Sequence, residues 1–290
     1  METALSTLHQ TGVVPVQAES DERLIQMWLH SKSTRTKDAY QADIQRFLDF
    51  VGVSIRQVRL VDLQAFDDSL AGIADNSRRR VLSAVKSLLT FATKLGYLPF
   101  NVGAALPLPS VKDTLAERIL PEDVVHRIIA LEPDQRNRVL LRFLYASGGR
   151  VSEVCSLKWR DLQERGKAGQ VTFYGKGGKT RHVPVSVDTW REVSALKNGS
   201  GPDEAVFKSR KGGHLVRSQV LRIVQAAAHR AGIEGNVSPH WFRHAHASHS
   251  IDRGCPISLV QATLGHARAD TTGRYLHARP GDSSALYLGV

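Results

Sequence analysis

A proline-containing segment near residue 100 divides the sequence of this chain into two parts. Residues 99–118 include Pro99, Pro107 and Pro109, and the apolar residues among them show no helical spacing. Proline has no backbone N–H and clashes with the preceding helical turn, so this composition is typical of a linker. A chain of 290 residues is long enough for two ordinary domains. We therefore expect one folded unit on each side of the segment.

The part before this segment has the pattern of an all-helical domain. Apolar residues recur there at intervals of three and four residues, as on one face of a helix. Helices are predicted over 21–30, from Ser33 or Thr34 to 51, over 61–70, and from Asn76 or Ser77 to Gly96. The predicted domain covers 19–107 and the linker 108–118. Residues 1–18 lack this spacing and are predicted to be disordered.

Helical patterns continue after the linker and are interrupted by a strand pattern. Helices are predicted over 121–131, 134–147, 151–158, 186–197, 215–231, 239–253, 256–263 and about 270–277. Residues 170–174 and 181–185 read as two strands around a glycine-rich turn. The predicted fold class is mainly α with a small antiparallel β-sheet in the second domain, over 119–281. A short tail over 282–290 follows.

The charge of the chain favours a polyanionic partner. The formal net charge is +11 and the pI about 9.9. Residues 1–112 carry 13 basic and 11 acidic side chains, whereas residues 113–290 carry 26 and 17. Lysine and arginine release counterions when they meet phosphates, so an excess of this kind suits nucleic acid. No apolar run has the length of a membrane span and the first residues do not resemble a secretory signal, so we expect a cytoplasmic protein.

Two cysteines and several histidines do not indicate a metal site. Cys155 and Cys255 are far apart in sequence, and we expect both to be buried, reduced thiols. His240 and His244 are one helical turn apart, but the glutamate of a His-Glu-x-x-His motif is missing and Arg243 would repel a cation. We therefore expect no metal. The neighbouring residues His244, His246 and His249 are expected to pack or to form hydrogen bonds.

Four segments of the second part carry side chains suited to phosphate chemistry. They are Tyr145–Glu153 (YASGGRVSE), Gly175–Lys179 (GKGGK), His240–His244 (HWFRH) and Leu264–His277 (LGHARADTTGRYLH). Gly178-Lys179-Thr180 resembles the end of a nucleotide-binding loop, but Phe173 stands where that motif needs glycine, and a strand pattern follows instead of a helix. A nucleotide site is therefore not expected.

Together, these four segments resemble the motifs of the tyrosine recombinase (phage integrase) family, in order and at compatible spacings. The layout is similar to the Xer and Cre members, in which a helical core-binding (SAM-like) DNA-binding domain precedes the catalytic domain. The resemblance covers about residues 20–280 and implies a two-domain clamp on DNA. It implies that Tyr275 is the nucleophile and that Glu153 supports the first arginine. The remaining catalytic residues that it implies are Arg150, Lys176, His240, Arg243 and His266.

These residue types fit the chemistry of a phosphodiester under attack. The guanidinium forks of Arg150 and Arg243 match the non-bridging oxygens, which gain charge in the transition state. Tyrosine ionises near pH 10, about three units above neutrality, so nearby cations and an acceptor such as His240 are needed. Lys176 is expected to protonate the departing 5′ oxygen, although Lys179 and Arg181 compete for that role. The phosphotyrosine ester conserves the bond energy, so no cofactor is expected.

Other basic residues are candidates for contacts with the DNA backbone, although a run of charges is commonly just a solvated face. The candidates are Lys32, Arg35, Lys37, Arg78, Arg79, Arg80, Lys86, Lys179 and Arg181. The family resemblance further implies a homotetramer on two double-stranded DNA sites, with the tail over 282–290 docked on a neighbouring protomer. A partner recombinase or accessory protein is a further option. The alternatives are a catalytically silent DNA-binding protein and strand relaxation like that of a type IB topoisomerase.

Overall fold

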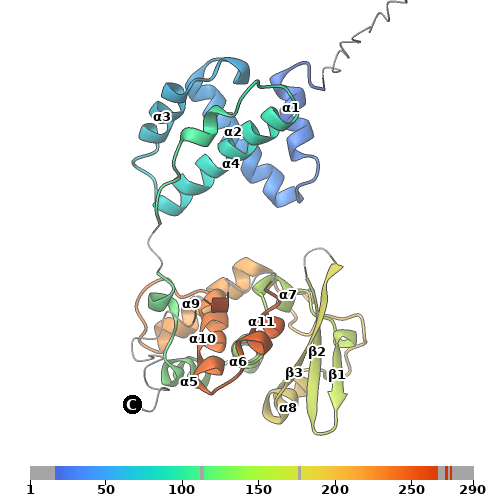
Figure 1. The fold of residues 1–290 in the computed structure, drawn as a ribbon. Coiled ribbons are helices and arrows are strands. Elements are labelled where there is room, and N and C mark those ends of the chain that lie inside the picture. The colour runs from blue at the N-terminus through green and yellow to red at the C-terminus, as the bar shows by residue number, and fades with distance from the viewer. Residues whose placement is uncertain (1–16, 112–113, 176–177, 267–271, 274, 276–290) are drawn as a thin grey trace, which may run out of the picture. The chain divides into compact units, whose positions relative to one another are not determined.

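The chain separates into two units, residues 1–112 and 113–290, each with its own hydrophobic core (Figure 1). The structure is a computed structural model, and it describes residues 17–111, 114–175, 178–266, 272–273 and 275. Several predictions lie outside these residues: the disorder of residues 1–16, most of the helix over 270–277, the tail, and the position of Lys176. The predicted disorder of residues 1–18 is wrong at its end, because Ala18 is buried in the first core.

The first unit is a bundle of helices, as the apolar spacing predicts. Its helices are α1 (Asp21–Leu29), α2 (Thr34–Val51), α3 (Leu60–Ser69), α4 (Asp75–Lys94) and the 3₁₀ turn η1 (Ile55–Gln57). Ser20 caps α1 by accepting a hydrogen bond from the N–H of Arg23, and Gly52 ends α2 in the left-handed conformation, with φ of 62°. The fully buried Phe47 and Phe66 meet edge to face between α2 and α3.

The predicted N-cap of α4, Asn76 or Ser77, is two or three residues too late. Ala74 occupies the N-cap position, and its carbonyl accepts from the N–H groups of Ser77 and Arg78. Asp75 lies in the first turn, where a negative charge interacts favourably with the helix dipole. The sequence pattern pointed to Asn76 and Ser77 because such side chains often cap helices, but here both lie inside the helix.

The proline-containing segment is more closely packed than its composition suggests. Residues Val102–Ala105 form the 3₁₀ turn η2, and Leu106 is buried in the first core. Side chains of α4 hold the segment from outside: Lys86 donates to the carbonyl of Leu106, and Arg79 to that of Pro109 at 2.6 Å. The first unit therefore includes the chain as far as Pro109. The spacing of apolar residues in the sequence does not predict these contacts.

In the second unit a three-stranded antiparallel sheet lies beside a group of helices (Figure 1). Its helices are α5 (Glu122–Ala130), α6 (Gln135–Ser147), α7 (Val151–Cys155), α8 (Val187–Ala195), α9 (Arg217–Arg230), α10 (Pro239–Asp252), α11 (Ile257–Leu264) and the 3₁₀ turns η3 (Ala116–Arg118) and η4 (Trp159–Asp161). The strands are β1 (Leu162–Arg165), β2 (Ala168–Tyr174) and β3 (Thr180–Val185), in the order β1-β2-β3. The expected fold class is confirmed.

Two predictions for this unit need correction. The sequence did not indicate β1, because Gln163, Glu164 and Arg165 are all exposed and show no alternation of polar and apolar residues. The helix predicted over 151–158 ends at Cys155, because the backbone N–H of Lys158 is bound by the carboxylate of Asp161 at 2.9 Å. The chain turns after Cys155, and the first strand, β1, begins at Leu162.

The core of the second unit is formed by α6 and α10 with one face of the sheet. Phe143, Phe173 and Phe242 are among its fully buried side chains. On the sheet, a Cβ at Gly169 would lie 2.1 Å from the Trp190 ring of α8, so this close contact requires glycine. Cys155 is buried and Cys255 only half-buried; both are free thiols. Across the described part of the chain, no helix is long and apolar enough to cross a membrane.

Candidate active site

Two glycines place Arg150 at the start of α7. Gly148 ends α6 with φ of 58°, a conformation that favours glycine. A Cβ at Gly149 would lie 2.7 Å from the ring of Phe173, so the turn fits tightly against β2. Arg150 then occupies the N-cap of α7, where its backbone N–H donates to Glu153 at 2.8 Å. The two glycines thus let the turn pack against the core of the second unit, and this places Arg150 at the start of α7.

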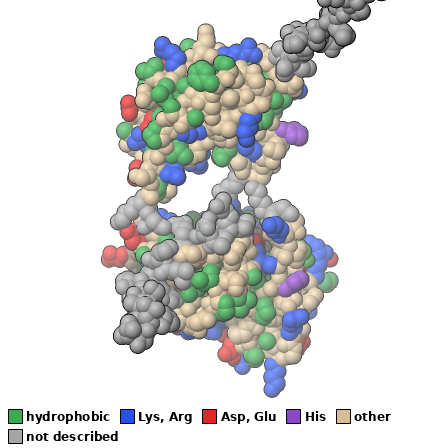
Figure 2. All heavy atoms as spheres, viewed as in Figure 1, with side chains coloured by type: hydrophobic (Ala, Val, Ile, Leu, Met, Phe, Trp, Pro, Cys, Tyr) green, Lys and Arg blue, Asp and Glu red, His purple; other side chains and the backbone are tan. Residues whose placement is uncertain are grey.

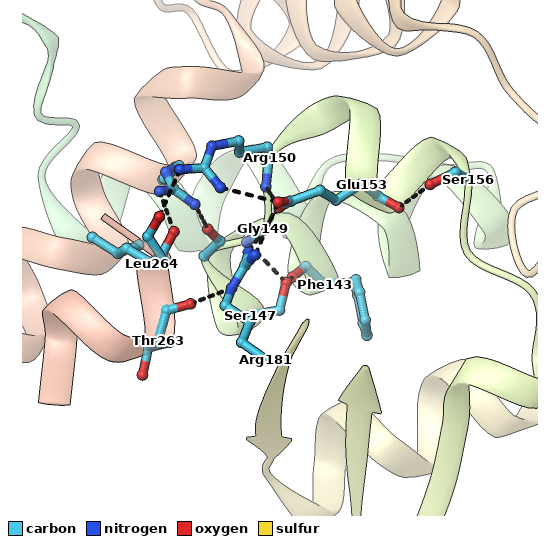
Figure 3. Close-up of polar contacts among 12 residues, drawn as sticks. Phe143, Ser147, Gly149, Arg150, Glu153, Ser156, Arg181, Thr263 and Leu264 are labelled. Carbon is cyan, nitrogen blue, oxygen red and sulfur yellow. Dashed lines mark hydrogen bonds and ion pairs between the residues drawn. The ribbon is translucent and has the colours of Figure 1, made fainter. Parts of the chain in front are cut away.

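Glu153 lies between two guanidinium groups (Figure 3). Arg150 contacts one carboxylate oxygen at 3.0 Å, and Arg181 contacts both oxygens, at 2.9 and 2.7 Å. Burial raises the pKa of Glu153, but the hydrogen bonds and charge of Arg181 and Arg150 outweigh it and lower the pKa to about 2. The carboxylate is therefore ionised at neutral pH and orients both arginines.

Arg181 reaches three elements from its position on β3. Its Nε donates to the carbonyl of Thr263 in α11 at 2.7 Å, while its other nitrogens bind Glu153 in α7 (Figure 3). Its guanidinium also lies 4.6 Å from the centre of the Phe173 ring. The sequence suggested Arg181 as a DNA contact or as a competitor of Lys176. The structure places it as a link between β3, α7 and α11, with little of its side chain exposed.

Arg243 lies deeper, on α10. It is 4% exposed, and it donates to the carbonyls of Gly148 at 2.5 Å and Leu264 at 2.6 Å. Burial, and then the charges of Arg150 and Arg181, lower its pKa to about 10; Glu153 and Tyr275 act in the opposite direction. The side chain therefore remains a cation at neutral pH. It ties the turn before Arg150 to the end of α11, and it lies within electrostatic reach of Tyr275.

Two of the predicted histidines are held in the neutral form. Burial lowers the pKa of His266 to about 4, with Arg243 and Arg150 adding to the effect, and its Nδ1 lies 2.9 Å from the hydroxyl of Thr272. His240 is exposed in the first turn of α10, yet the protein around its ring removes enough water to lower its pKa, and Arg243 adds to the effect. Each neutral ring therefore has one unprotonated nitrogen that can accept a proton.

Tyr275 has a partner that the sequence did not assign to it. Its hydroxyl lies 2.8 Å from Nδ1 of His244 on α10, and the residue is only 4% exposed. Its ring packs in a small cluster with Ala247, Val260 and Leu264. We predicted packing or hydrogen bonding for His244 but no catalytic role. The available signal was its spacing, since His240 and His244 lie one turn apart on the same helical face.

A cavity of about 640 Å³ lies beside Arg150, Glu153 and Arg181, whereas His240, Arg243 and Tyr275 are not part of its lining. Its lining comes from α7, the β2–β3 hairpin and α11 and consists of Arg150, Ser152, Glu153, Tyr174, Gly175, Lys179, Thr180, Arg181, Ala262, Gly265 and His266. Lys179 is exposed at this cavity, and its carbonyl closes the hairpin by accepting from the N–H of Gly175 at 2.7 Å. Arg150 also donates to the carbonyl of Gly265 at 2.9 Å. Five of the sequence-predicted residues with ionisable side chains (Arg150, Glu153, Lys179, Arg181 and His266) therefore line one cavity.

Five of the seven basic candidates of the first unit have partners inside that unit. Arg78 pairs with Asp67, and Arg80 with the buried Asp43. Arg79 and Lys86 hold the segment after α4, and Lys32 lies over the rings of Trp28 and Tyr40, at 4.9 and 5.3 Å from their centres. Lys37 is half-buried on α2, and only the backbone of Arg35 is described. Lysine and arginine side chains are spread over the visible face of each unit (Figure 2).

In the described residues, no group of three His, Cys, Asp or Glu side chains is arranged to hold a metal ion. The site as described is instead a set of guanidinium groups and neutral histidines around one carboxylate.

The sequence profile of the phage integrase family matches residues 118–281, which is more than half of the chain. The chain belongs to the phage integrase family. The profile of the family's N-terminal SAM-like domain matches residues 24–96. The resemblance inferred from the four motifs is therefore confirmed, as is the expected class of enzyme, a tyrosine recombinase.

Named relatives of this phage integrase family member include two kinds of Xer recombinase. Tyrosine recombinase XerC of Xylella fastidiosa (strain M23) is 34% identical over 258 residues, which cover 84% of this chain and 86% of the relative. Tyrosine recombinase XerD of Mycobacterium tuberculosis (strain H37Rv) is 30% identical over 272 residues, covering 84% and 87%.

Solved structures share the fold at low sequence identity. XerH bound to its difH substrate matches with a TM-score of 0.73 and 18% identity, covering 93% of this chain and 84% of that one. A lambda integrase (75–356) dimer bound to a COC′ core site matches with a TM-score of 0.73 and 17% identity, covering 90% and 95%.

Proposed function

We propose that this tyrosine recombinase cuts and rejoins DNA at specific sites through a 3′-phosphotyrosine bond to Tyr275. The observation that carries the proposal is a cavity lined by Arg150, Lys179 and Arg181, in which Glu153, paired with the two arginines, is the one carboxylate of the described lining. Arg243 adds a further buried cation next to it. A surplus of positive charge in a partly enclosed cavity suits a phosphate group.

The proposed reaction is an in-line exchange of one phosphate ester for another. Tyr275 Oη gives its proton to a neighbouring histidine and attacks the phosphorus, and the bond from phosphorus to the 5′ oxygen breaks. Arg150 and Arg243 stabilise charge on the non-bridging oxygens, each preorganised donor contributing about 2–4 kcal/mol. Arg150 is held in place by Glu153 and Gly265, and Arg243 by Gly148 and Leu264. Lys176 protonates the 5′ oxygen, and reversal of these steps rejoins a strand.

Strand exchange needs four cleavages, and we propose a tetramer on two double-stranded DNA sites. A lambda integrase tetramer bound to a Holliday junction shares the fold of this chain, with a TM-score of 0.69. In the proposed assembly the helical first unit binds DNA, residues 282–290 dock on a neighbouring protomer, and no metal ion or nucleotide takes part. The alternatives are supercoil relaxation without site preference and DNA binding without chemistry.

The test is a strand-exchange assay in EDTA with two DNA segments that carry a site recovered from covalently trapped genomic DNA. We expect recombinant products of discrete length, with no divalent ion or nucleotide added. Relaxation of supercoiled DNA that lacks the site would instead support a topoisomerase. Binding with no cleaved strand would support a silent DNA-binding protein. A strict need for a divalent metal would contradict the proposed mechanism.

A further inference from the structure

Among the described residues, two side-chain contacts join the segment that carries Tyr275 to the rest of the second unit. At one end the hydroxyl of Thr272, which is fully buried, lies 2.9 Å from Nδ1 of His266. At the other end the hydroxyl of Tyr275 lies 2.8 Å from Nδ1 of His244. A turn joins the two, with the N–H of Tyr275 donating to the carbonyl of Thr272 at 3.1 Å. His244 is thus in direct contact with the atom that would attack the phosphorus.

Because Tyr275 is buried, a neighbouring side chain has to accept the proton of its hydroxyl. Tyr275 is 4% exposed, so bulk water has little access to its hydroxyl. A phenolate without a partner is costly in such a place, and the proton needs an acceptor already in contact. The ring of His240, by comparison, lies on the exposed side of α10, with its centre 6.3 Å from that of His244.

We propose that His244, rather than His240, accepts the proton of Tyr275 when a strand is cut, and returns it when the strand is rejoined. This inference rests on the proposed function. In the cutting step the Oη–H bond breaks, a bond forms from that proton to Nδ1 of His244, and the Oη electron pair forms the new bond to phosphorus. The bond from phosphorus to the 5′ oxygen breaks, and that oxygen takes its proton from a separate acid, Lys176. The imidazole must begin with its own proton on Nε2.

The neighbouring charges support this division of roles. Tyr275 and Arg243 are close enough for the tyrosine to influence the arginine's pKa, so the cation stabilises developing negative charge on the phenol oxygen. His240 remains available to the phosphate as a hydrogen-bond donor. The two histidines of the His-x-x-Arg-His segment then act on different atoms: His244 on the nucleophile and His240 on the phosphate.

The decisive variant is His244→Asn. The asparagine side-chain oxygen takes nearly the position of Nδ1 and can hold the Tyr275 hydroxyl, but it cannot take up the proton. We expect specific DNA binding close to that of the wild type, and covalent capture on a nicked substrate slower by about 10²-fold or more, the usual contribution of a general base. Capture at a near wild-type rate would show that the histidine only positions the tyrosine.

A second measurement separates lost proton transfer from damage to the site. Ring-fluorinated tyrosine at position 275 ionises more readily, so it needs less help from a base. It should restore much of the rate in His244→Asn and little of it in His240→Asn. Rescue of the His240 variant instead, or of neither, would overturn the assignment to His244. Should His244→Asn lower the unfolding temperature, His244→Gln is measured in the same way.

The wild-type enzyme on the same substrate keeps the two proposals apart. If the wild type forms no covalent adduct at all, the proposed function fails. If it forms one and the fluorinated tyrosine does not distinguish the two histidine variants as expected, only the role of His244 fails.

Discussion

Glu153 holds the guanidinium groups of Arg150 and Arg181 in place beside the cavity. It accepts from Arg150 and Arg181 and from the backbone N–H at the start of α7. With Glu153 ionised, the two guanidinium groups face the cavity in fixed orientations. Without that charge, two cations would lie close together in a partly buried place, which is unfavourable. The residue is therefore important both for folding and for the geometry of the cavity.

Replacing Glu153 with glutamine should destabilise the protein at neutral pH by about 3 kcal/mol, because breaking a buried ion pair leaves Arg181 uncompensated. The pH dependence has a definite sign. The folded-state pKa is lowered from 4.5 to about 2, so the carboxylate stabilises the fold above pH 4.5, and this contribution is lost as the pH falls towards 2. Urea unfolding at pH 7, 5 and 3 measures it.

The difference in unfolding free energy between wild type and Glu153→Gln should shrink between pH 5 and pH 3. The exposed Glu164 of β1 provides a matched control, since Glu164→Gln removes a carboxylate that faces solvent. A wild-type–variant difference that stays constant over this pH range would show that the charge of Glu153 is not what stabilises the site.

Among the elements, the β2–β3 hairpin carries two lysines, of which the sequence favoured Lys176 over Lys179 as the general acid. Lys179 is exposed at the cavity, whereas Lys176 lies outside the described residues. We predict that Lys176→Ala slows cleavage of ordinary DNA but not of DNA with a sulfur atom at the 5′ bridging position, because that leaving group needs little protonation. Single-turnover cleavage of both substrates by Lys176→Ala and Lys179→Ala distinguishes the two lysines. Equal loss on both substrates for Lys176→Ala would remove it from the role of general acid.

Most elements could be predicted because each has its own pattern along the chain. The helices of both units follow apolar spacing, and β2 and β3 follow their β-branched and aromatic residues. β1 was missed because three of its four side chains are exposed, and hydrogen bonding to β2 alone makes it a strand. The packed course of residues 102–109 depends on contacts with α4, such as that of Lys86 with Leu106. Such contacts have no local signal.

In the site too, residue types could be predicted from local motifs, whereas contacts between distant residues could not. The four motifs identified the ionisable residues that line the cavity, because their types and order follow the chemistry. The pairing of Arg181 with Glu153 joins residues 28 positions apart, and that of His244 with Tyr275 joins residues 31 apart. Charge and spacing alone left Arg181 as a candidate DNA contact and His244 as a packing residue. Only the fold of the second unit gives these two side chains their partners.

In the whole molecule, each of the two units has its own hydrophobic core. We therefore expect contacts between protomers on DNA to be made by segments outside these cores. Residues 282–290 include Leu286, Tyr287, Leu288 and Val290. We predict that deleting this tail leaves binding to a single site nearly intact but weakens synapsis and recombination, because apolar side chains of this kind can be buried on a neighbouring protomer. Gel shifts beside a recombination assay provide the comparison.

Replacement of Leu286 and Leu288 by serine is the milder control, since it keeps the length of the tail. It should reproduce most of the effect of the deletion. Normal synapsis by the deleted protein would exclude a role of the tail in assembly.

Tyr275 is the residue that we propose to form the covalent bond to DNA. The direct measurement is covalent capture on a nicked DNA site, with the modified peptide identified by mass spectrometry. Tyr174, which is 65% exposed in the cavity lining, supplies a matched control. We predict that Tyr174→Phe still forms an adduct on Tyr275, and that Tyr275→Phe binds the site and forms none. An adduct that persists in Tyr275→Phe, or one that maps to another residue, would contradict the account.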